Sequence, residues 1–171
     1  MQIRTSSLYG LRPSCPVDPR HPVDRHGHYH RYANCDDRQK ESIARFLCRP
    51  CGRTISVLPD HFLPYRAVAV PLVQQHFDAR ALDGQPQEPP ATEKEKGCLK
   101  RAWDRFGQRL TALTTMLGQL MQIRIRTPKL IWSTLRRLGN LPAILRQLAQ
   151  PFNTSLLHDY RCLQPWRRRT D

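Results

Sequence analysis

Long apolar runs are missing from this sequence of 171 residues. Residues 1–10 contain no apolar segment of the kind that forms the centre of a signal peptide. No later segment has about eighteen uninterrupted apolar residues, which is the length that a membrane-spanning helix needs. We therefore expect a cytoplasmic protein with no membrane partner.

Catalytic motifs are missing as well. None of His26, His28 and His30 is followed two positions later by glutamate, as a zinc deaminase requires ahead of its Pro-Cys-x-x-Cys motif. We find no His-Glu-x-x-His motif, no Gly-rich phosphate loop and no Ser/His/Asp spacing. The sequence therefore predicts that the protein is not an enzyme and has no small-molecule substrate.

Acidic residues are scarce, because 14 Asp and Glu stand against 28 Lys and Arg, which gives a net charge of +14. The calculated isoelectric point is about 10.3. Such an excess says little about the fold, but it favours polyanionic partners. Double-stranded DNA is the first expectation, ahead of RNA and of an anionic membrane surface.

The six cysteines of the chain are expected to be reduced, since no export signal is seen. Clustered cysteines in a reducing compartment are more often metal ligands than disulfides. Cys48 and Cys51 are separated by two residues and followed by Gly52, and they stand between two apolar segments. This pattern predicts a strand, a tight turn that presents two thiolates, and a return strand, as in a zinc knuckle.

A structural Zn²⁺ needs two further ligands. Cys15 lies in a proline-rich turn and is the expected third ligand. Asp18 stands where a second Cys-x-x-Cys pair would place a cysteine, and His21 and Cys35 are alternatives for the fourth ligand. The competing interpretation is a ribbon that has lost its metal. Cys98 and Cys162 are isolated in the sequence and are expected to be plain thiols.

The predicted fold class is α+β, with a small zinc-ribbon β domain followed by a mainly α-helical basic region. We expect a flexible arm at 1–14, the ribbon at 15–66, a helix within 67–82 and a linker at 83–91. A helical region at 92–160 and a basic tail at 161–171 complete the chain. Within the ribbon, alternation along residues 23–33 would place His26, His28 and His30 on one face, turned toward solvent or phosphate rather than a second metal.

Thr92 and Glu95 form a capping-box pattern, which predicts a long helix that starts there and can break near Gly107. Its apolar residues follow a heptad spacing, which favours a contact inside the molecule over a dimer zipper. Basic residues lie beside this seam on the same helix. Because such a helix can contact the major groove of DNA, this helix could be the second one of a helix-turn-helix whose first helix is at 71–81. Further helices are predicted after Pro128 and after Pro142.

Several motifs in the first half of the chain resemble those of a known protein family. Cys15-Pro16, His26-Gly27-x-Tyr29-x-Arg31, Arg45-Phe46-x-Cys48-x-x-Cys51-Gly52-Arg53-Thr54-x-Ser56-x-Leu58-Pro59 and Leu63-Pro64-Tyr65 are similar to the zinc-ribbon module of bacterial transposase-related, insertion-sequence proteins. The resemblance covers about residues 12–80. It implies a four-ligand zinc ribbon and a helix-turn-helix that together bind transposon-end DNA, with Asp18 in place of a cysteine.

From this we expect the DNA-binding part of a transposition protein without its nuclease domain, because the chain after residue 92 is poor in carboxylates. A homodimer or a transposase is a further expected partner. The alternative is a zinc-ribbon module for protein interaction or transcriptional regulation. The residues expected to contact nucleic acid are Arg31, Arg49, Arg53, Lys100, Arg101, Arg105 and Arg109.

Overall fold

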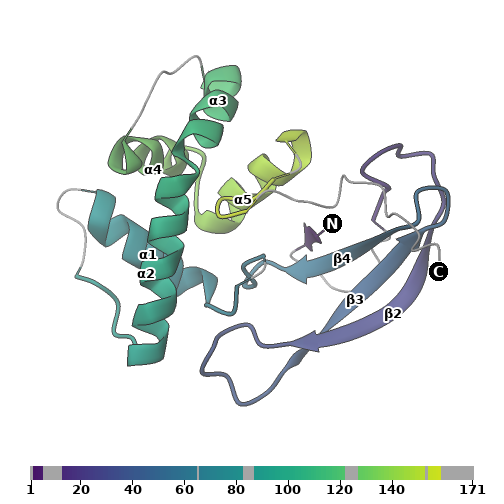
Figure 1. Cartoon of the computed structure of the whole chain (residues 1–171), viewed down its shortest axis with the longest axis horizontal. Coiled ribbons are helices and arrows are strands. Elements are labelled where there is room, and N and C mark those ends of the chain that lie inside the picture. Colours follow the sequence, from purple (N-terminus) through teal and green to yellow (C-terminus); the bar gives the residue numbers. More distant parts are fainter. Residues whose placement is uncertain are drawn as a thin grey trace, which may run out of the picture.

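The computed structural model describes residues 2–5, 13–64, 66–82, 87–121, 127–152 and 154–158. A sheet lies on one side of the molecule and the helices lie on the other, so the predicted α+β class is confirmed (Figure 1). The strands are β1 (Gln2–Thr5), β2 (Val23–Arg31), β3 (Glu41–Cys48) and β4 (Arg53–Pro59). The helices are α1 (Val70–Ala81), α2 (Glu93–Gln108), α3 (Leu110–Met121), α4 (Pro128–Arg136) and α5 (Leu141–Phe152).

The sheet has the strand order β1-β4-β3-β2. Strands β2, β3 and β4 follow one another as antiparallel neighbours, whereas β1 pairs with β4 in parallel, with Ile3 opposite Val57. The prediction of a flexible arm at 1–14 is therefore wrong for residues 2–5, which extend the sheet. Residues 1 and 6–12, as well as the predicted basic tail, lie outside the described residues.

Strand β2 contains a β-bulge. Arg25 pairs with Phe46 and His28 pairs with Ala44, so His26 and Gly27 together stand opposite one residue of β3. Gly27 has a φ of 101°, which side chains other than that of glycine rarely adopt. The extra residue breaks the alternation on which the expectation for the three histidines rested.

The two faces of the sheet carry different apolar clusters, as the two-residue period of a strand requires. One face holds Val23, Phe46, Cys48, Ile55 and Val57, with Cys15 packed onto it. The opposite face holds Ile43 and Leu58, which pack with Ala33 and Phe62 from the adjoining loops. The first cluster is the one that surrounds the cysteines of the predicted knuckle.

The helices enclose a separate core. Phe77 of α1 stacks against Trp103 and Phe106 of α2 and Trp132 of α4, with ring centroids 4.9 to 5.2 Å apart. Asp78 is buried beside them and accepts hydrogen bonds from Trp132 Nε1 (2.8 Å) and Arg136 Nε (2.9 Å). An aromatic core with one anchored carboxylate thus fixes α1 against α4.

The heptad seam belongs to this core. Leu99, Phe106, Leu113 and Leu117 are each at most 1% exposed, and Trp103 and Leu110 pack against the same cluster. The contact inside the molecule that the spacing favoured is therefore confirmed, and these residues are unavailable as a dimer zipper. Leu120 falls outside the residues whose side chains the structure describes.

The predicted capping box is present, because Glu95 N donates to the Thr92 hydroxyl and Thr92 N donates to the Glu95 carboxylate. The predicted long helix divides at Arg109, two residues after Gly107. Arg109 is 7% exposed and donates from Nη2 to Thr154 Oγ1 at 2.8 Å. This tertiary contact fixes the point at which α2 ends and α3 begins.

Helices α1 and α2 do not form an ordinary helix-turn-helix. The connection between them runs from Leu82 to Thr92, whereas that unit has a turn of about three to four residues. Glu88 in this connection reaches back to α1 and binds His76 Nδ1 (2.6 Å) and Arg80 Nε (3.1 Å). Of the described helices, none is both long and apolar enough to cross a membrane.

Candidate metal centre

Two turns at the same end of the sheet bring four ligand atoms together. Cys48 ends β3, and the turn to β4 carries Cys51 and then Gly52 at a φ of 63°. Positive φ at Gly52 lets the backbone reverse within four residues. The other turn carries Cys15 and His21 and leads directly into β2. Because Val23 at the start of β2 pairs with Cys48, the sheet register holds the two turns side by side.

The distances fit a tetrahedral metal. Ligand atoms of Cys15, His21, Cys48 and Cys51 all lie within 4.8 Å of one another. At ordinary zinc bond lengths, tetrahedral ligands are separated by about 3.8 Å for two sulfurs and about 3.6 Å for sulfur and nitrogen. Cys15 Sγ and Cys51 Sγ are 3.7 Å apart, and His21 Nδ1 lies 3.7, 3.2 and 3.8 Å from the sulfurs of Cys15, Cys51 and Cys48. The cluster is therefore already spaced for one ion.

The cluster is shielded from solvent on the side of the sheet. Cys48 is fully buried and Cys15 is 2% exposed, while Cys51 and His21 are partly buried. The backbone N–H of Val17 donates to Cys15 Sγ at 3.4 Å, as backbone amides do to thiolates in metal knuckles. Such an arrangement holds the first sulfur in place before a metal binds.

Burial and hydrogen bonding shift the pKa values of two of the thiols in opposite directions. Burial alone would raise the pKa of Cys15, but the backbone amides of Asp18 and Val17 and the neighbouring Cys48 and His21 lower it to about 6. Burial, followed by the neighbouring thiols Cys48 and Cys15, raises the pKa of Cys51 to about 11. Of Cys15 and Cys51, Cys15 is thus the thiol that ionises first, and its negative charge favours the protonated form of Cys51 until a cation binds.

The alternatives for the fourth ligand lie elsewhere. The Asp18 carboxylate is held by Arg20, through Nε at 3.0 Å and Nη2 at 2.9 Å, and its pKa is lowered by these bonds. Asp18 Oδ2 is 3.8 Å from His21 Nε2, the ring nitrogen that faces away from the sulfurs. Asp18 is therefore placed beside the histidine rather than in the group of four, and Cys35 is not in the group either.

The residues expected to contact nucleic acid have different environments. Arg31 Nη2 donates to the carbonyl oxygens of Leu63 (3.1 Å) and Arg66 (2.8 Å), and Arg109 is buried as described. Arg31 and Arg109 therefore serve the fold.

The other five lie nearer the surface. Lys100 and Arg101 are exposed on α2, and Arg49 is exposed in the knuckle turn, where its Nε binds Asp24 Oδ2 at 2.6 Å. Arg53 is partly buried at the start of β4. Arg105 is partly buried and donates to the Leu157 carbonyl (3.4 Å) and to Gln108 (2.9 Å).

The three histidines of β2 do not share one environment. His28 and His30 lie on one face of the strand, with ring centroids 5.1 Å apart, and both are exposed. His26 is in the bulge. Among the described residues, none of the three belongs to a group with metal-ligand spacing.

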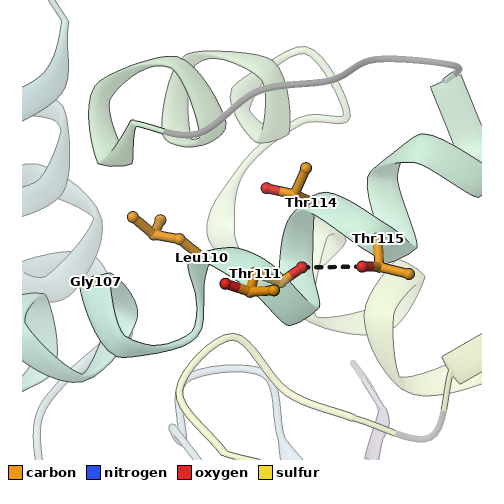
Figure 2. A pocket seen from close by; sticks show the side chains of 5 residues that line it. All are labelled: Gly107, Leu110, Thr111, Thr114 and Thr115. Atoms are coloured by element: carbon orange, nitrogen blue, oxygen red, sulfur yellow. Dashed lines mark hydrogen bonds between the residues drawn. The ribbon is translucent and has the colours of Figure 1, made fainter.

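Two hollows on the surface lie away from the metal cluster. One, of about 580 Å³, lies beside the break between α2 and α3 (Figure 2) and is lined by Gly107, Leu110, Thr111, Thr114 and Thr115. The Thr115 hydroxyl donates to the Thr111 carbonyl oxygen at 3.1 Å. None of these described lining residues is charged or can act as an acid or base near neutral pH, so they offer no group for proton transfer.

The other hollow lies between the β2–β3 connection and the start of α1, and Asn34, Asp37, Arg38, Glu41 and His61 contribute to its lining. His61 Nε2 lies 2.9 Å from a Glu41 carboxylate oxygen. Both side chains are exposed at this contact. It is an exposed surface contact rather than an enclosed pair of side chains.

Comparison with protein-family models, with curated proteins and with solved structures gives no significant match.

One contact was missed by reasoning from the sequence. Asn34, in the loop after β2, donates from Nδ2 to Glu95 Oε1 in the first turn of α2 at 2.5 Å. No local pattern joins these two residues, because the contact is made between a loop and a helix that are distant in sequence. Cys98, expected to be an isolated thiol, accepts from Arg101 Nη2 at 3.1 Å.

Proposed function

We propose that this protein binds double-stranded DNA and that a structural Zn²⁺ at Cys15, His21, Cys48 and Cys51 holds its sheet together. The observation that carries the proposal is the tetrahedral spacing of these four ligand atoms in a chain of net charge +14. Sulfur and imidazole ligands are typical of zinc, and a basic surface is typical of proteins that neutralise phosphates.

The ligand set supports a structural rather than a catalytic ion. Four protein ligands fill the coordination sphere of tetrahedral zinc, whereas catalytic sites keep one position open for water or substrate. The sulfurs of Cys15 and Cys48 are also buried against the sheet. We therefore propose a binding protein that is not an enzyme, in agreement with the missing catalytic motifs.

Exposure narrows the choice of phosphate contacts. Lys100 and Arg101 follow one another on α2, and both are exposed. Arg49 is exposed beside the metal centre, so the same strand turn that supplies Cys48 and Cys51 also presents a cation. We propose that these three residues contact the DNA backbone, with Arg53 and Arg105 in supporting positions.

The biological setting is proposed from the resemblance of the knuckle residues to transposase-related zinc ribbons. A protein of this kind would act on cellular DNA in the cytoplasm of a bacterium, in transposition or as a regulator derived from it. The connection from Leu82 to Thr92 is too long for an ordinary helix-turn-helix made of α1 and α2. Contacts with the DNA bases would therefore come from a different arrangement of helices.

Binding of fluorescent duplex DNA, measured by anisotropy at several salt concentrations, tests the proposal. We expect affinity to fall steeply with salt, and the double variant Lys100→Ala/Arg101→Ala to weaken binding and to reduce the salt slope by about 2. The single variants Lys100→Ala and Arg101→Ala are each compared with Lys129→Ala, which removes one positive charge from an exposed position on α4.

An unchanged affinity between low and high salt would contradict DNA binding. Competition with structured RNA distinguishes the two nucleic acids, because RNA that displaces duplex DNA at lower concentration would make RNA the partner. A stable complex with another protein that forms without nucleic acid would instead support the alternative function, a zinc-ribbon module for protein interaction.

A further inference from the structure

Helices α4 and α5 are joined by a short turn. α4 ends at Arg136 and α5 begins at Leu141, so residues 137–140 connect them. Gly139 in this turn has a φ of 124°, and a Cβ built on it would lie 3.2 Å from Ala143 Cβ. Two helices joined by three to four residues that often include glycine form the unit that places its second helix in the major groove of DNA. This pair therefore has the connection that α1 and α2 lack.

Contacts with α1 hold this turn in one conformation. Arg136 donates from Nε to the buried Asp78 of α1 (2.9 Å) and from Nη1 to the Gly139 carbonyl oxygen (2.6 Å). Leu141 N, at the start of α5, donates to Gln74 Oε1 of α1 at 2.7 Å. α1 thus contacts both helices of the pair and supports them as a third helix (Figure 1). The position of α5 relative to α4 is therefore fixed by the fold.

α5 has one side in the core and another side at the surface. Its core residues, each at most 1% exposed, are Leu141, Ile144, Leu145 and Leu148. Ala143 and Arg146 are partly exposed and Gln147 is exposed. These three residues share a helix face, because they are three and four positions apart. Arg146 Nη1 also donates to Asp60 Oδ2 at 2.7 Å, so the most accessible polar side chain on this face is that of Gln147.

The chain around α5 is basic. All 14 acidic residues of the protein lie outside residues 105–158, whereas Lys and Arg recur within this range. Asp60 and Asp78 reach the helix pair from other parts of the chain, and each is paired with an arginine, Arg146 and Arg136 respectively. Arg137 in the turn is exposed. The charge of this surface is thus complementary to that of a phosphate backbone.

We propose that α5 is a recognition helix, which lies in the major groove of double-stranded DNA and reads a base pair through Gln147. The inference rests on the proposed binding of duplex DNA and adds the element that gives this binding a sequence preference. A glutamine side chain can form two hydrogen bonds with N6 and N7 of adenine, and a small apolar side chain such as that of Ala143 can contact the methyl group of thymine. Arg137 contacts the phosphate backbone beside the groove.

Selection from a pool of duplexes with a random central segment tests the base contact. The full chain, loaded with zinc, is used, and the bound duplexes are sequenced after several rounds. We expect the wild type to enrich a motif that contains an A·T pair, and Gln147→Ala to lose the preference for that pair by about 5- to 100-fold. The variant should keep its affinity for other duplexes, because no charge is removed.

Gln75→Ala is the matched control for this variant. It shortens the same type of side chain at an exposed position of α1 and should enrich the wild-type motif. The thermal unfolding midpoints of both variants should equal that of the wild type, because neither side chain is buried.

A base analogue places the contact in the major groove. 7-Deazaadenine pairs normally with thymine but lacks N7, the acceptor that adenine presents in the major groove. We expect this analogue, at the preferred adenine, to weaken binding of the wild type by at least 3-fold. It should not weaken binding of Gln147→Ala further, because the side chain that reads N7 is already absent.

Arg137→Ala tests the phosphate contact separately. It should lower the affinity for every duplex to a similar extent, reduce the salt slope by about 1 and leave the enriched motif unchanged. Lys129→Ala removes one charge near the opposite end of α4 and should change none of these values.

The outcomes distinguish this inference from the proposed function. Salt-dependent binding without an enriched motif, or a motif that Gln147→Ala leaves unchanged, would overturn the assignment of α5 while DNA binding stands. An equal loss with 7-deazaadenine in the wild type and in Gln147→Ala would also overturn it. Failure of the wild type to bind any duplex would overturn both.

Discussion

At the scale of single residues, the metal centre depends on the choice between His21 and Asp18. Both follow Cys15 in the same turn, and both are chemically able to bind zinc. The structure turns His21 Nδ1 toward the three sulfurs and leaves the Asp18 carboxylate with Arg20. Asp18 lies 3.8 Å from the other ring nitrogen of His21, where a carboxylate can orient a metal-bound imidazole.

We therefore predict different metal contents for two variants. Purified wild type should contain one zinc per chain, His21→Ala should lose most of it, and Asp18→Ala should keep it with an affinity lower by about 10- to 100-fold. Atomic emission after gel filtration measures the zinc, and competition with a chromophoric chelator measures the affinity. Loss of zinc in Asp18→Ala with retention in His21→Ala would reverse the assignment of the fourth ligand.

The sequence identifies the cysteine ligands but leaves this choice open. Cys48-x-x-Cys51-Gly52 is a local pattern whose turn geometry follows from its residues, and Cys15 is the cysteine that precedes it in a proline-rich turn. The fourth ligand depends on the path of the chain through three prolines between Cys15 and Pro22. Several paths satisfy that spacing, and the pairing of Val23 with Cys48 selects one of them.

At the scale of elements, the start of α2 is both capped and attached to the sheet. Glu95 is 8% exposed and accepts bonds from Thr92 N and from Asn34. The Asn34 side chain, followed by the Thr92 backbone, lowers the pKa of Glu95. One carboxylate thus completes the capping box and also attaches the loop of the sheet.

Removal of the cap should be measurable. We predict that Thr92→Ala lowers the free energy of unfolding by about 1 to 2 kcal/mol, because the first turn of α2 loses its side-chain acceptor. Thr127→Ala, which removes the simpler cap of α4, should cost about 1 kcal/mol or less. Urea unfolding followed by circular dichroism gives both values. Equal losses for the two variants would mean that the junction with the sheet adds nothing at Thr92.

Helix boundaries show where local sequence information ends. Thr92 and Glu95 predict the start of α2 because a capping box is made within four residues. The division at Arg109 is not encoded locally, since Gly107 continues the helix and the turn occurs where Arg109 reaches Thr154. The pairing of β1 with β4 is equally nonlocal, because it joins the two ends of the sheet region.

At the scale of the whole molecule, the sheet and the helices have separate apolar cores. The sheet core that contains Cys15 and Cys48 is small, and units of this size commonly need a metal to fold. The helical core, with Phe77 and Trp132 at its centre, has no such requirement.

We therefore predict that removal of zinc affects the two regions unequally. After chelation, backbone amides of β2, β3 and β4 should exchange with solvent at least 10-fold faster, while those of α1 and α4 change little, because only the sheet loses the ion. Hydrogen exchange with mass spectrometry measures both regions in one sample. Uniform acceleration across the chain would show that the two cores unfold together.

The dependence of the free energy of unfolding on pH should reflect a buried histidine of the helical region. His76 is 3% exposed, and its burial holds its pKa below the ordinary value of 6.5, although Glu88 acts in the opposite direction. The unfolded chain then binds a proton more readily than the folded one, so the stability contributed by neutral His76 is complete above pH 6.5 and is lost as pH falls below it.

Accordingly, the free energy of unfolding should decrease as pH falls below 6.5, and it should decrease less in His76→Gln. His26→Gln, which changes an exposed histidine of the bulge, serves as the control and should follow the wild type. Urea titrations at several pH values give the comparison. An unchanged slope in His76→Gln would assign the acid sensitivity to other groups.

The bulge at His26 and Gly27 has a consequence for how the molecule behaves in a crowded cell. β2 is an outer strand of the sheet, and a long flat outer strand is a template on which other chains can add and aggregate. The local twist at Gly27, together with the exposed side chains of Arg25, His28 and His30, makes this edge a poor template. The glycine of the bulge thereby protects this edge of the sheet from the addition of other strands.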